Sequence, residues 1–266
     1  MPPGFGPIAG LKVGHAQDER ALTGCTVFLA EPGMTAGCDL RGSATGTREL
    51  TVLDPAHIAA KIHGLVLAGG SAYGLDAAAG VMRWLEERGI GFDAEVARVP
   101  IVPAAILFDL ALGDAKRRPD AKMGYQAAEA AREGSLAEGN VGAGTGASVG
   151  KIAGIDRAMK SGLGCWTESC AAGGAQAVQI AALAAVNAFG DVRDPATGRV
   201  LAGARTSPAS RDLVDTAVAL RKGFAPPSFG GAATPQNTVL VVVATDALLS
   251  RVEAGRLAVT SVGSAR

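Results

Sequence analysis

The apolar residues of this chain fall into short runs separated by glycine- and proline-rich turns, a pattern typical of alternating strands and helices. Residues 10–30 alternate apolar and turn residues, which predicts two strands around a turn at residues 16–21. A short buried strand is predicted at residues 65–68. Two longer strands are predicted at residues 178–187 and 239–245, and the last of these has the strongest strand pattern in the chain.

Three helices are predicted between the early strands and the middle of the chain. Asp54 and Pro55 form a capping residue followed by a proline suited to the first helical position, so a helix is predicted to begin there. Residues 73–88 carry an apolar face at helical spacing, and Gly89 follows as a stop. Residues 125–133 predict an alanine-rich helix suited to close packing.

The remaining segments read as turns and connections. Residues 139–150 form the most glycine-dense loop, and residues 191–198 predict a turn between two strands. A proline-rich connection at residues 224–236 leads to Asn237 and Thr238, directly before the strongest strand. No internal repeat or charged linker divides the chain, so residues 1–266 are interpreted as a single domain.

Composition and charge narrow the possible partners. The chain has 266 residues, of which 48% are apolar, enough for a full core. Its 25 basic residues balance 25 acidic ones without a basic run, which argues against a nucleic-acid partner. The apolar runs are far shorter than a membrane span, and the first residues do not resemble a signal peptide. A cytoplasmic protein with no membrane partner is therefore expected.

The potential metal ligands are not arranged as a site. The four cysteines contain no Cys-x-x-Cys pair, and the three histidines all lie in the first quarter of the chain. A zinc site would need more closely spaced ligands. No metal and no cofactor are therefore predicted, and the cysteines are interpreted as reduced, mostly buried thiols.

Three common glycine-rich signatures are incomplete in this chain. The pair at residues 150–151 resembles the end of a phosphate loop, but Thr145 and Ile152 occupy positions that the loop requires for other residues. Residues 142–147 match a dinucleotide fingerprint without a preceding buried strand. Tyr73 stands where an esterase elbow needs glycine. Nucleotide binding and a Ser–His–Asp hydrolase are therefore disfavoured.

The pair Asn237–Thr238 carries a different chemistry. A threonine hydroxyl within a chain is a poor nucleophile because no group takes its proton. At a new N-terminus the same residue has an α-amine beside its hydroxyl, and this amine, with a reference pKa of about 7.7–8.0, can act as the general base. Such a nucleophile needs no histidine. A threonine that opens a strand after an asparagine turn is, however, also an ordinary structural feature.

Several ordered motifs give the chain a resemblance to a known family. They occur at residues 11–16, 23–27, 41–42, 46–49, 63–76, 140–146, 150–151, 186–187 and 237–238, and the most specific is the run Leu-Ala-Gly-Gly-Ser-Ala-Tyr-Gly-Leu at 67–75. Over residues 10–258 the chain resembles the autoprocessing L-aminopeptidase/D-amino-acid-esterase family, peptidase family S58. This family also contains β-aminopeptidases and the nylon-oligomer endohydrolase.

The resemblance implies roles for individual residues. Thr238 matches the family's nucleophile, Lys151 matches a lysine placed beside it in the nylon-oligomer branch, and Asn187 matches an active-site asparagine suited to donate to an oxyanion. Cleavage between Asn237 and Thr238 is implied, giving fragments 1–237 and 238–266. The resemblance also assigns substrate binding to Gly70, Ser71 and Tyr73 of the most specific motif.

The resemblance also implies a fold and an activity. The fold is an α/β four-layer α/β/β/α sandwich of the N-terminal-nucleophile type, assembled as a homo-oligomer, a tetramer of processed protomers. The activity is hydrolysis of amide bonds in small peptides, aminoacyl amides or nylon-type oligomers through an acyl-enzyme on Thr238. A threonine nucleophile together with Lys151 favours the amidase or nylon-oligomer branch.

One feature departs from the family pattern. Only 28 residues follow Thr238, and residues 258–266 do not continue the pattern of a further helix and strands. A short acidic motif such as Asp-Gly-Asp, which family members carry near the nucleophile, is missing. A truncated or frameshifted chain, or an impaired activity, is therefore expected.

Two other functions remain compatible with the sequence. One is an acyltransferase of the ornithine acetyltransferase type, which shares the sandwich fold and a threonine nucleophile but transfers the acyl group to an amine. The other is a non-catalytic, unprocessed relative that keeps only the pocket.

Overall fold

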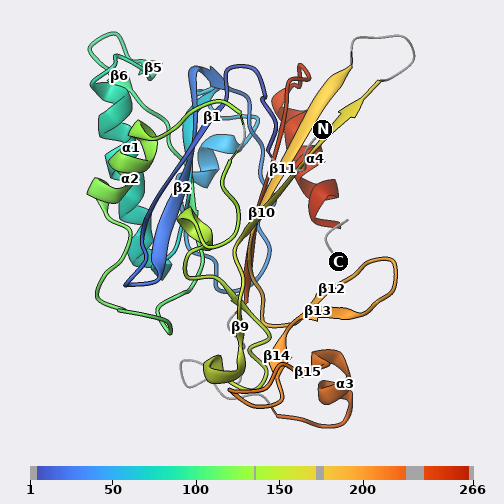
Figure 1. Ribbon diagram of the computed structural model, residues 1–266. Helices are drawn as coiled ribbons and strands as arrows, with labels where there is room; N and C mark the ends of the chain where they lie inside the picture. Colours follow the sequence, from blue (N-terminus) through green and yellow to red (C-terminus); the bar gives the residue numbers. More distant parts are fainter. Residues whose placement is uncertain (1–4, 135, 172–176, 226–236, 264–266) are drawn as a thin grey trace.

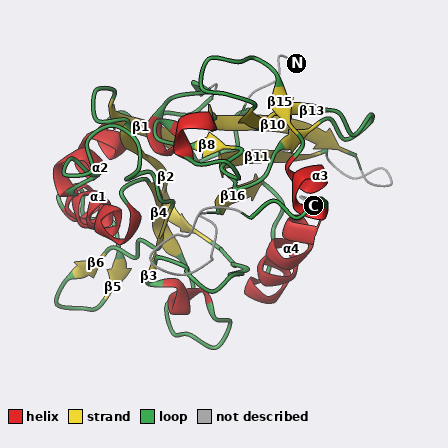
Figure 2. Ribbon diagram, turned by 90° about the horizontal axis from the view of Figure 1, so that it is seen from below, coloured by secondary structure: helices red, strands yellow, loops and turns green. Residues whose placement is uncertain are grey.

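The computed structural model describes residues 5–134, 136–171, 177–225 and 237–263. Two β-sheets lie face to face in the centre of the molecule. Helices α1 and α2 cover the outer side of the first sheet, and helix α4 lies beyond the second sheet on the opposite side (Figures 1 and 2). The four-layer α/β/β/α arrangement expected from the sequence is confirmed.

The first sheet has five strands and contains the most thoroughly buried part of the chain. Its order is β1-β2-β4-β7-β3, with β4 and β7 parallel and the other neighbours antiparallel. The early hairpin and the short buried strand are both where the apolar pattern predicts them. The strands are β1 (Lys12–Asp18), β2 (Thr23–Met34), β3 (Thr47–Arg48), β4 (Ile62–Ala68) and β7 (Ala104–Ile106).

Helices α1 (Ala77–Glu86) and α2 (Ala121–Glu129) pack against each other through glycines. A Cβ added at Gly80 would overlap the carbonyl oxygen of Ala121, so the two backbones are in direct contact. A short 3₁₀ helix, η2 (Ser71–Asp76), precedes α1. Helix α2 begins four residues earlier than predicted because the Asp120 side chain caps it by accepting a hydrogen bond from Met123 N at 2.8 Å.

The helix predicted to begin at Asp54 and Pro55 is wrong. A 3₁₀ helix, η1 (Leu50–Leu53), ends before them, and the Asp54 carboxylate accepts a hydrogen bond from Ala56 N at 2.8 Å. An aspartate that bonds the backbone two residues ahead stabilises a turn. The same side chain suits a helix cap or such a turn, so the sequence signal was ambiguous.

The second sheet has three antiparallel strands, β10 (Leu163–Cys170), β11 (Val178–Asn187) and β16 (Thr238–Thr245), in that order. The side of the sheet that carries Ala181, Leu183 and Ala185 packs against Phe28 and Leu67 of the first sheet. Both long strands agree with the sequence prediction. This inner face between the sheets is the second part of the hydrophobic core.

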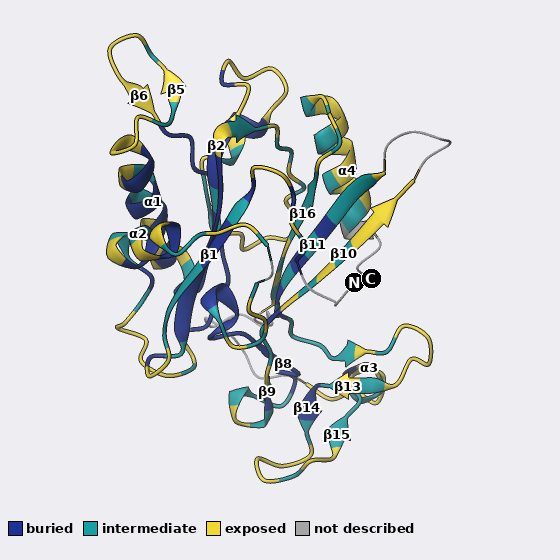
Figure 3. Cartoon of the chain, turned by 45° about the horizontal axis from the view of Figure 1, so that its top comes forward, coloured by how far each residue is buried: buried dark blue, intermediate teal, exposed yellow. Residues whose placement is uncertain are grey.

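Helix α4 (Arg251–Gly263) follows β16 and is held at its start by the loop around η1. The Arg251 guanidinium donates hydrogen bonds to the carbonyl oxygens of Val52, Asp54 and His57. Residues 258–263, which belong to the tail that does not continue the family pattern, are thus helical. The outer face of the second sheet stays partly open beside this helix (Figure 3).

A smaller lobe lies below the two sheets in Figure 1. The turn predicted at residues 191–198 is found in this lobe, between β12 and β13. A separate short hairpin, β5 and β6, extends from the end of α1. The short 3₁₀ helix η3 (Gly142–Gly144) is not part of the lobe and lies against β2, where Ala143 N donates to Thr26 Oγ1 at 3.1 Å. The lobe and hairpin elements are β8 (Ser148–Val149), η4 (Ile155–Arg157), β9 (Met159–Lys160), β12 (Val192–Arg193), β13 (Val200–Ala202), β14 (Ala204–Arg205), β15 (Leu213–Val214), α3 (Thr216–Arg221), β5 (Phe92–Asp93) and β6 (Arg98–Val99).

The structure also bears on the expectations about membrane spans and cysteine thiols. Within the described ranges, no helix has the length and apolar character needed to cross a membrane. The expectation of mostly buried thiols is wrong. Cys25 is buried, and burial raises its pKa to about 12, but Cys38 and Cys170 are exposed and Cys165 is half-buried.

Candidate active site

Thr238 and Asn187 lie opposite each other at one end of the second sheet. Thr238 is the first residue of β16, Asn187 is the last residue of β11, and the antiparallel register pairs them directly. Directly paired residues of neighbouring strands point to the same face, with Cβ atoms about 4.5–5.5 Å apart. The alternation along β11 assigns that face to the inner side, toward the first sheet.

The Asn187 side chain is completely buried and forms hydrogen bonds at both ends. Its Oδ1 accepts hydrogen bonds from Ser148 N at 3.1 Å and from Lys151 Nζ at 2.7 Å. Its Nδ2 donates to the carbonyl oxygen of Phe108 at 2.9 Å. The side chain therefore connects the loop after β7, the loop at β8 and its own strand.

Lys151 is also buried, with 6% of its surface exposed. Its Nζ donates to the backbone oxygen of Asn187 at 2.8 Å as well as to Oδ1. Burial lowers the pKa of Lys151 to about 7, because the charged ammonium is removed from water. A lysine with this pKa is partly neutral near pH 7 and can accept a proton.

The backbone before Lys151 requires a glycine. Gly150 has a φ of +72°, and a Cβ there would overlap the backbone of Gly203 and Ala204. Its N–H donates to Gly190 O at 2.8 Å, and the N–H of Lys151 donates to Phe189 O at 2.8 Å. These bonds tie the lysine loop to the residues directly after β11.

The predicted cleavage site lies beside the same segment. Asn237 is exposed, and its Oδ1 accepts a hydrogen bond from Phe189 N at 3.1 Å. Phe189 thus binds Lys151 through its carbonyl and Asn237 through its N–H. The structure therefore brings together three of the sequence-predicted residues, Lys151, Asn187 and Thr238, around the predicted Asn237–Thr238 cleavage site.

The residues predicted to bind substrate lie on the turn from β4 into η2. Gly70 and Ser71 have left-handed backbones, and their N–H groups donate to Asp109 Oδ1 at 2.6 Å and Leu107 O at 3.1 Å. Tyr73 is 61% exposed, and the Arg118 guanidinium stacks over its ring at 3.9 Å.

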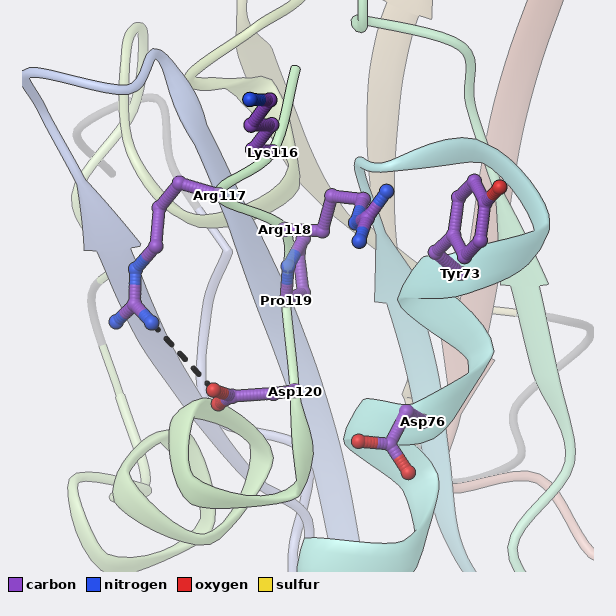
Figure 4. Close-up of a pocket in the computed structure, with 7 residues that line it drawn as sticks. All are labelled: Tyr73, Asp76, Lys116, Arg117, Arg118, Pro119 and Asp120. Carbon is purple, nitrogen blue, oxygen red and sulfur yellow. Dashed lines mark hydrogen bonds and ion pairs between the residues drawn. The ribbon is translucent and has the colours of Figure 1, made fainter. Parts of the chain in front are cut away.

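Tyr73 belongs to a pocket that includes none of the three buried-site residues. This pocket has a volume of about 340 Å³ and is shown in Figure 4, with the Tyr73 ring facing Arg118. Its lining residues are Tyr73, Asp76, Lys116, Arg117, Arg118, Pro119 and Asp120. The structure thus connects Gly70 to the site through Asp109, the neighbour of Phe108, whereas Tyr73 faces another pocket.

Sequence reasoning missed the residues that hold Asn187 in place. Ser148 and Phe108 do so through backbone groups, which carry no side-chain signal in the sequence. Asp109 did leave a signal, because it is a lone acidic residue in the apolar run at residues 101–112. Among the residues described, no group of three or more His, Cys, Asp or Glu side chains could hold a metal ion.

Known sequences similar to this chain include peptidases and amide-bond hydrolases. Residues 7–266 match the sequence model of peptidase family S58. The chain is 42% identical over 276 residues to a Mycobacterium tuberculosis protein described as an uncharacterized aminopeptidase, covering 96% of this chain and 73% of that protein. It is 30% identical over 251 residues to the 6-aminohexanoate-oligomer endohydrolase of a Kocuria species, covering 94% of this chain and 65% of that enzyme.

Solved structures share the fold. The L-aminopeptidase D-Ala-esterase/amidase of Ochrobactrum anthropi, described as a variant of the Ntn-hydrolase fold, aligns with a TM-score of 0.66 at 18% identity. That alignment covers 100% of this chain and 71% of the other. A β-aminopeptidase of a Burkholderia species aligns with a TM-score of 0.57 at 22% identity, covering 96% and 66%.

Proposed function

Since this chain belongs to peptidase family S58, a family of peptide- and amide-bond hydrolases, we propose that it is an autoprocessing amidohydrolase with Thr238 as its nucleophile. One observation carries the proposal. Thr238 directly faces Asn187 across two strands, and Asn187 holds the amine of Lys151 with both of its oxygens. The residue that carries the hydroxyl, Thr238, and the buried amine of Lys151, whose pKa is about 7, thus both have Asn187 as a neighbour at the start of β16.

The first reaction would be cleavage of the chain. The Thr238 hydroxyl attacks the carbonyl carbon of Asn237, and neutral Lys151 takes the hydroxyl proton. The C–N bond then breaks, and the nitrogen of Thr238 receives a proton and becomes the α-amine, leaving an ester between Asn237 and the threonine oxygen. Water hydrolyses this ester, which frees the Asn237 carboxylate and restores the hydroxyl.

The second reaction would use the freed Thr238 on a substrate. Its hydroxyl attacks the amide carbonyl of the substrate, with the α-amine or Lys151 taking the proton. The substrate amine leaves with that proton, and an acyl ester remains on Thr238. Water then hydrolyses the ester and releases the acid, so each turnover consumes one amide bond and one water molecule.

Asn187 would serve this chemistry in two ways. Its oxygens position Lys151, as the two hydrogen bonds indicate. A side-chain amide has two N–H donors, and the Phe108 carbonyl accepts from this nitrogen at 2.9 Å. The other donor is the one that we assign to the developing oxyanion, the role suggested by the sequence.

The substrates we propose are small peptides, aminoacyl amides and oligomers of the nylon type. Relatives described as an aminopeptidase and as a 6-aminohexanoate-oligomer endohydrolase support this range. A threonine nucleophile that shares Asn187 with a buried lysine favours the amidase or nylon-oligomer branch. A panel of aminoacyl amides, D-alanine amide and linear 6-aminohexanoate oligomers would separate the branches.

Intact-mass measurement on the purified protein tests the processing step. Fragments 1–237 and 238–266 are expected. Thr238→Val keeps the shape and strand preference of threonine, so it should fold, remain a single chain and hydrolyse nothing. Thr238→Ser should retain part of both activities, and Thr245→Val at the other end of β16 is the matched control.

A single uncleaved mass after prolonged incubation, together with no hydrolysis of any panel substrate, would favour a non-catalytic relative instead. Hydroxylamine added during turnover should release the acyl group as a hydroxamate, since it attacks the Thr238 ester. If Thr238→Val hydrolyses the substrates as fast as the parent, another nucleophile is at work.

A further inference from the structure

Asp109 is a buried carboxylate in the loop directly after β7, with 4% of its surface exposed. Its Oδ1 accepts a hydrogen bond from Gly70 N at 2.6 Å, and its Oδ2 accepts one from Thr23 Oγ1 at 2.7 Å. Burial raises its pKa, and these hydrogen bonds and the positive charge of Lys160 oppose that rise. An isolated buried carboxylate is costly, so its retention in a core position calls for an explanation.

The surrounding backbone is shaped to admit this carboxylate. A Cβ on Gly69 would overlap Asp109 Oδ2, and a Cβ on Gly146 would overlap both Oδ2 and Cβ of Asp109. Three separate segments, at residues 23, 69–70 and 146, therefore enclose one side chain. All three segments restrict the position of the Asp109 side chain.

Asp109 shares a rigid unit with the carbonyl that holds Asn187. The C=O of Phe108 and the N–H of Asp109 belong to the same peptide plane, which resists rotation about its C–N bond. Fixing Asp109 therefore limits the directions in which the Phe108 carbonyl can point. That carbonyl accepts the Nδ2 hydrogen bond of Asn187 at 2.9 Å.

The orientation of the Asn187 amide matters because its two ends are chemically opposite. Its other neighbours, Ser148 N and Lys151 Nζ, are both hydrogen-bond donors and need the oxygen. A flipped amide would direct N–H groups at both donors and leave the Phe108 carbonyl facing an oxygen. A correctly directed carbonyl excludes that flip.

We propose that Asp109 is a positioning residue of the active site, which anchors the Phe108 carbonyl and through it orients Asn187 toward Lys151. This inference rests on the proposed function for its catalytic consequence, although the positioning itself is a structural property. Asp109 thereby links the first sheet, through Thr23 and the Gly70 turn, to Asn187 of the second sheet, and through Asn187 to Lys151.

The asparagine side chains provide a readout that needs no activity. The chain has only three asparagines, at positions 140, 187 and 237, so protein labelled with ¹⁵N-asparagine gives three pairs of side-chain amide signals, one pair for each NH₂ group. The Asn187 signal, identified by its loss in Asn187→Ala, should exchange slowly with D₂O. In Asp109→Ala that protection should be lost, whereas Asp109→Asn should keep it, because an amide can replace both hydrogen bonds when Thr23 reverses its hydroxyl.

Turnover should follow the same order. Asp109→Ala is expected to lower kcat about a hundredfold, the typical cost of a misplaced catalytic group, and Asp109→Asn should restore most of it. In the Asn187→Ala background, Asp109→Ala should change kcat by less than about twofold, since its effect passes through Asn187. Asp215→Asn, a hydrogen-bonded carboxylate at the start of α3, is the matched control and should change neither readout.

Specific outcomes would overturn the proposal. Retained Asn187 protection in a folded Asp109→Ala protein would show that Asp109 does not orient the amide. If Asp109→Ala raises KM and leaves kcat unchanged, the carboxylate serves only the Gly70 turn. Loss of protection in Asp109→Ala with an inactive parent enzyme would instead support the positioning and refute the proposed function.

Discussion

The two sheets of the molecule are covered to very different extents. In the first sheet, residues 23–30 of β2 are all buried, and α1 and α2 close its outer side. In the second sheet, residues 163–168 of β10 and 238–241 of β16 alternate between more covered and exposed positions, and the end of β10 is exposed throughout. Its open side includes Val239 and Val241, which are 46% and 41% exposed, and Trp166, which is 58% exposed.

This difference separates two tasks. The first sheet and its helices form a close-packed base, in which small changes of volume are costly. The second sheet presents the start of β16, and with it Thr238, from a layer packed firmly on one face only. The active site lies where the Asn187–Phe108 hydrogen bond joins the two sheets. The close-packed first sheet therefore orients Asn187 beside the more accessible strand β16.

The largest effect is expected in the active site, from Lys151→Arg. A guanidinium stays protonated at any working pH and cannot take the Thr238 proton in the cleavage step, which would otherwise free the α-amine, so kcat should fall by about 10²–10⁴. Lys12→Arg, an exposed lysine paired with Glu31, should leave kcat unchanged. Steady-state rates on the best substrate of the panel measure both, and an active Lys151→Arg enzyme would remove the lysine from the mechanism.

The pKa of Lys151 also predicts two pH dependences. Activity should rise with pH through about 7, as the lysine becomes neutral. Because this folded-state pKa lies below the ordinary value of 10.5, the unfolded chain binds more protons between pH 7 and 10.5, and Lys151 makes stability rise across that window. The slope of unfolding free energy against pH should decrease there in Lys151→Met, while an unchanged slope would place the pKa elsewhere.

The next largest effect compares one substitution in two helices. Gly80→Ala should destabilise the protein by about 3 kcal/mol, because the new Cβ overlaps the Ala121 carbonyl and the α1–α2 pair must separate. Gly255→Ala in α4 meets open space and should stabilise by about 0.5–1 kcal/mol through helix propensity. Denaturant unfolding of both variants measures the difference, and equal shifts would contradict the contrast between the layers.

A smaller effect compares one substitution in two strands. Val66→Ala in β4 removes two buried methyl groups at a fully buried position, which should cost about 2 kcal/mol. Val241→Ala in β16 starts from a side chain that is 41% exposed and should cost less than about 1 kcal/mol. A larger cost at Val241 would indicate that its face is covered in solution.

The sequence was most informative where one local pattern had one structural outcome. The strands at residues 65–68, 178–187 and 239–245 were predictable because period-two or continuous apolar runs of that length pack against a sheet. Asp54 misled because capping and turn formation use the same side-chain bond. The site residues Lys151, Asn187 and Thr238 were identified through the family motifs, and their catalytic roles remain predictions.

The sequence alone determined the main strands, through local apolar periodicity, and the family, through ordered motifs. The layered fold and the residues that meet at the start of β16 followed from the resemblance to that family. Only the tertiary structure decided which end of Asn187 faces Lys151, that Asp109 stands behind it, and that Tyr73 turns to Arg118 in another pocket. Those outcomes depend on backbone carbonyls and burial contributed by segments far apart in sequence. The pKa of Lys151 has the same origin, since a lysine loses its charge near pH 7 only when the folded protein removes it from water.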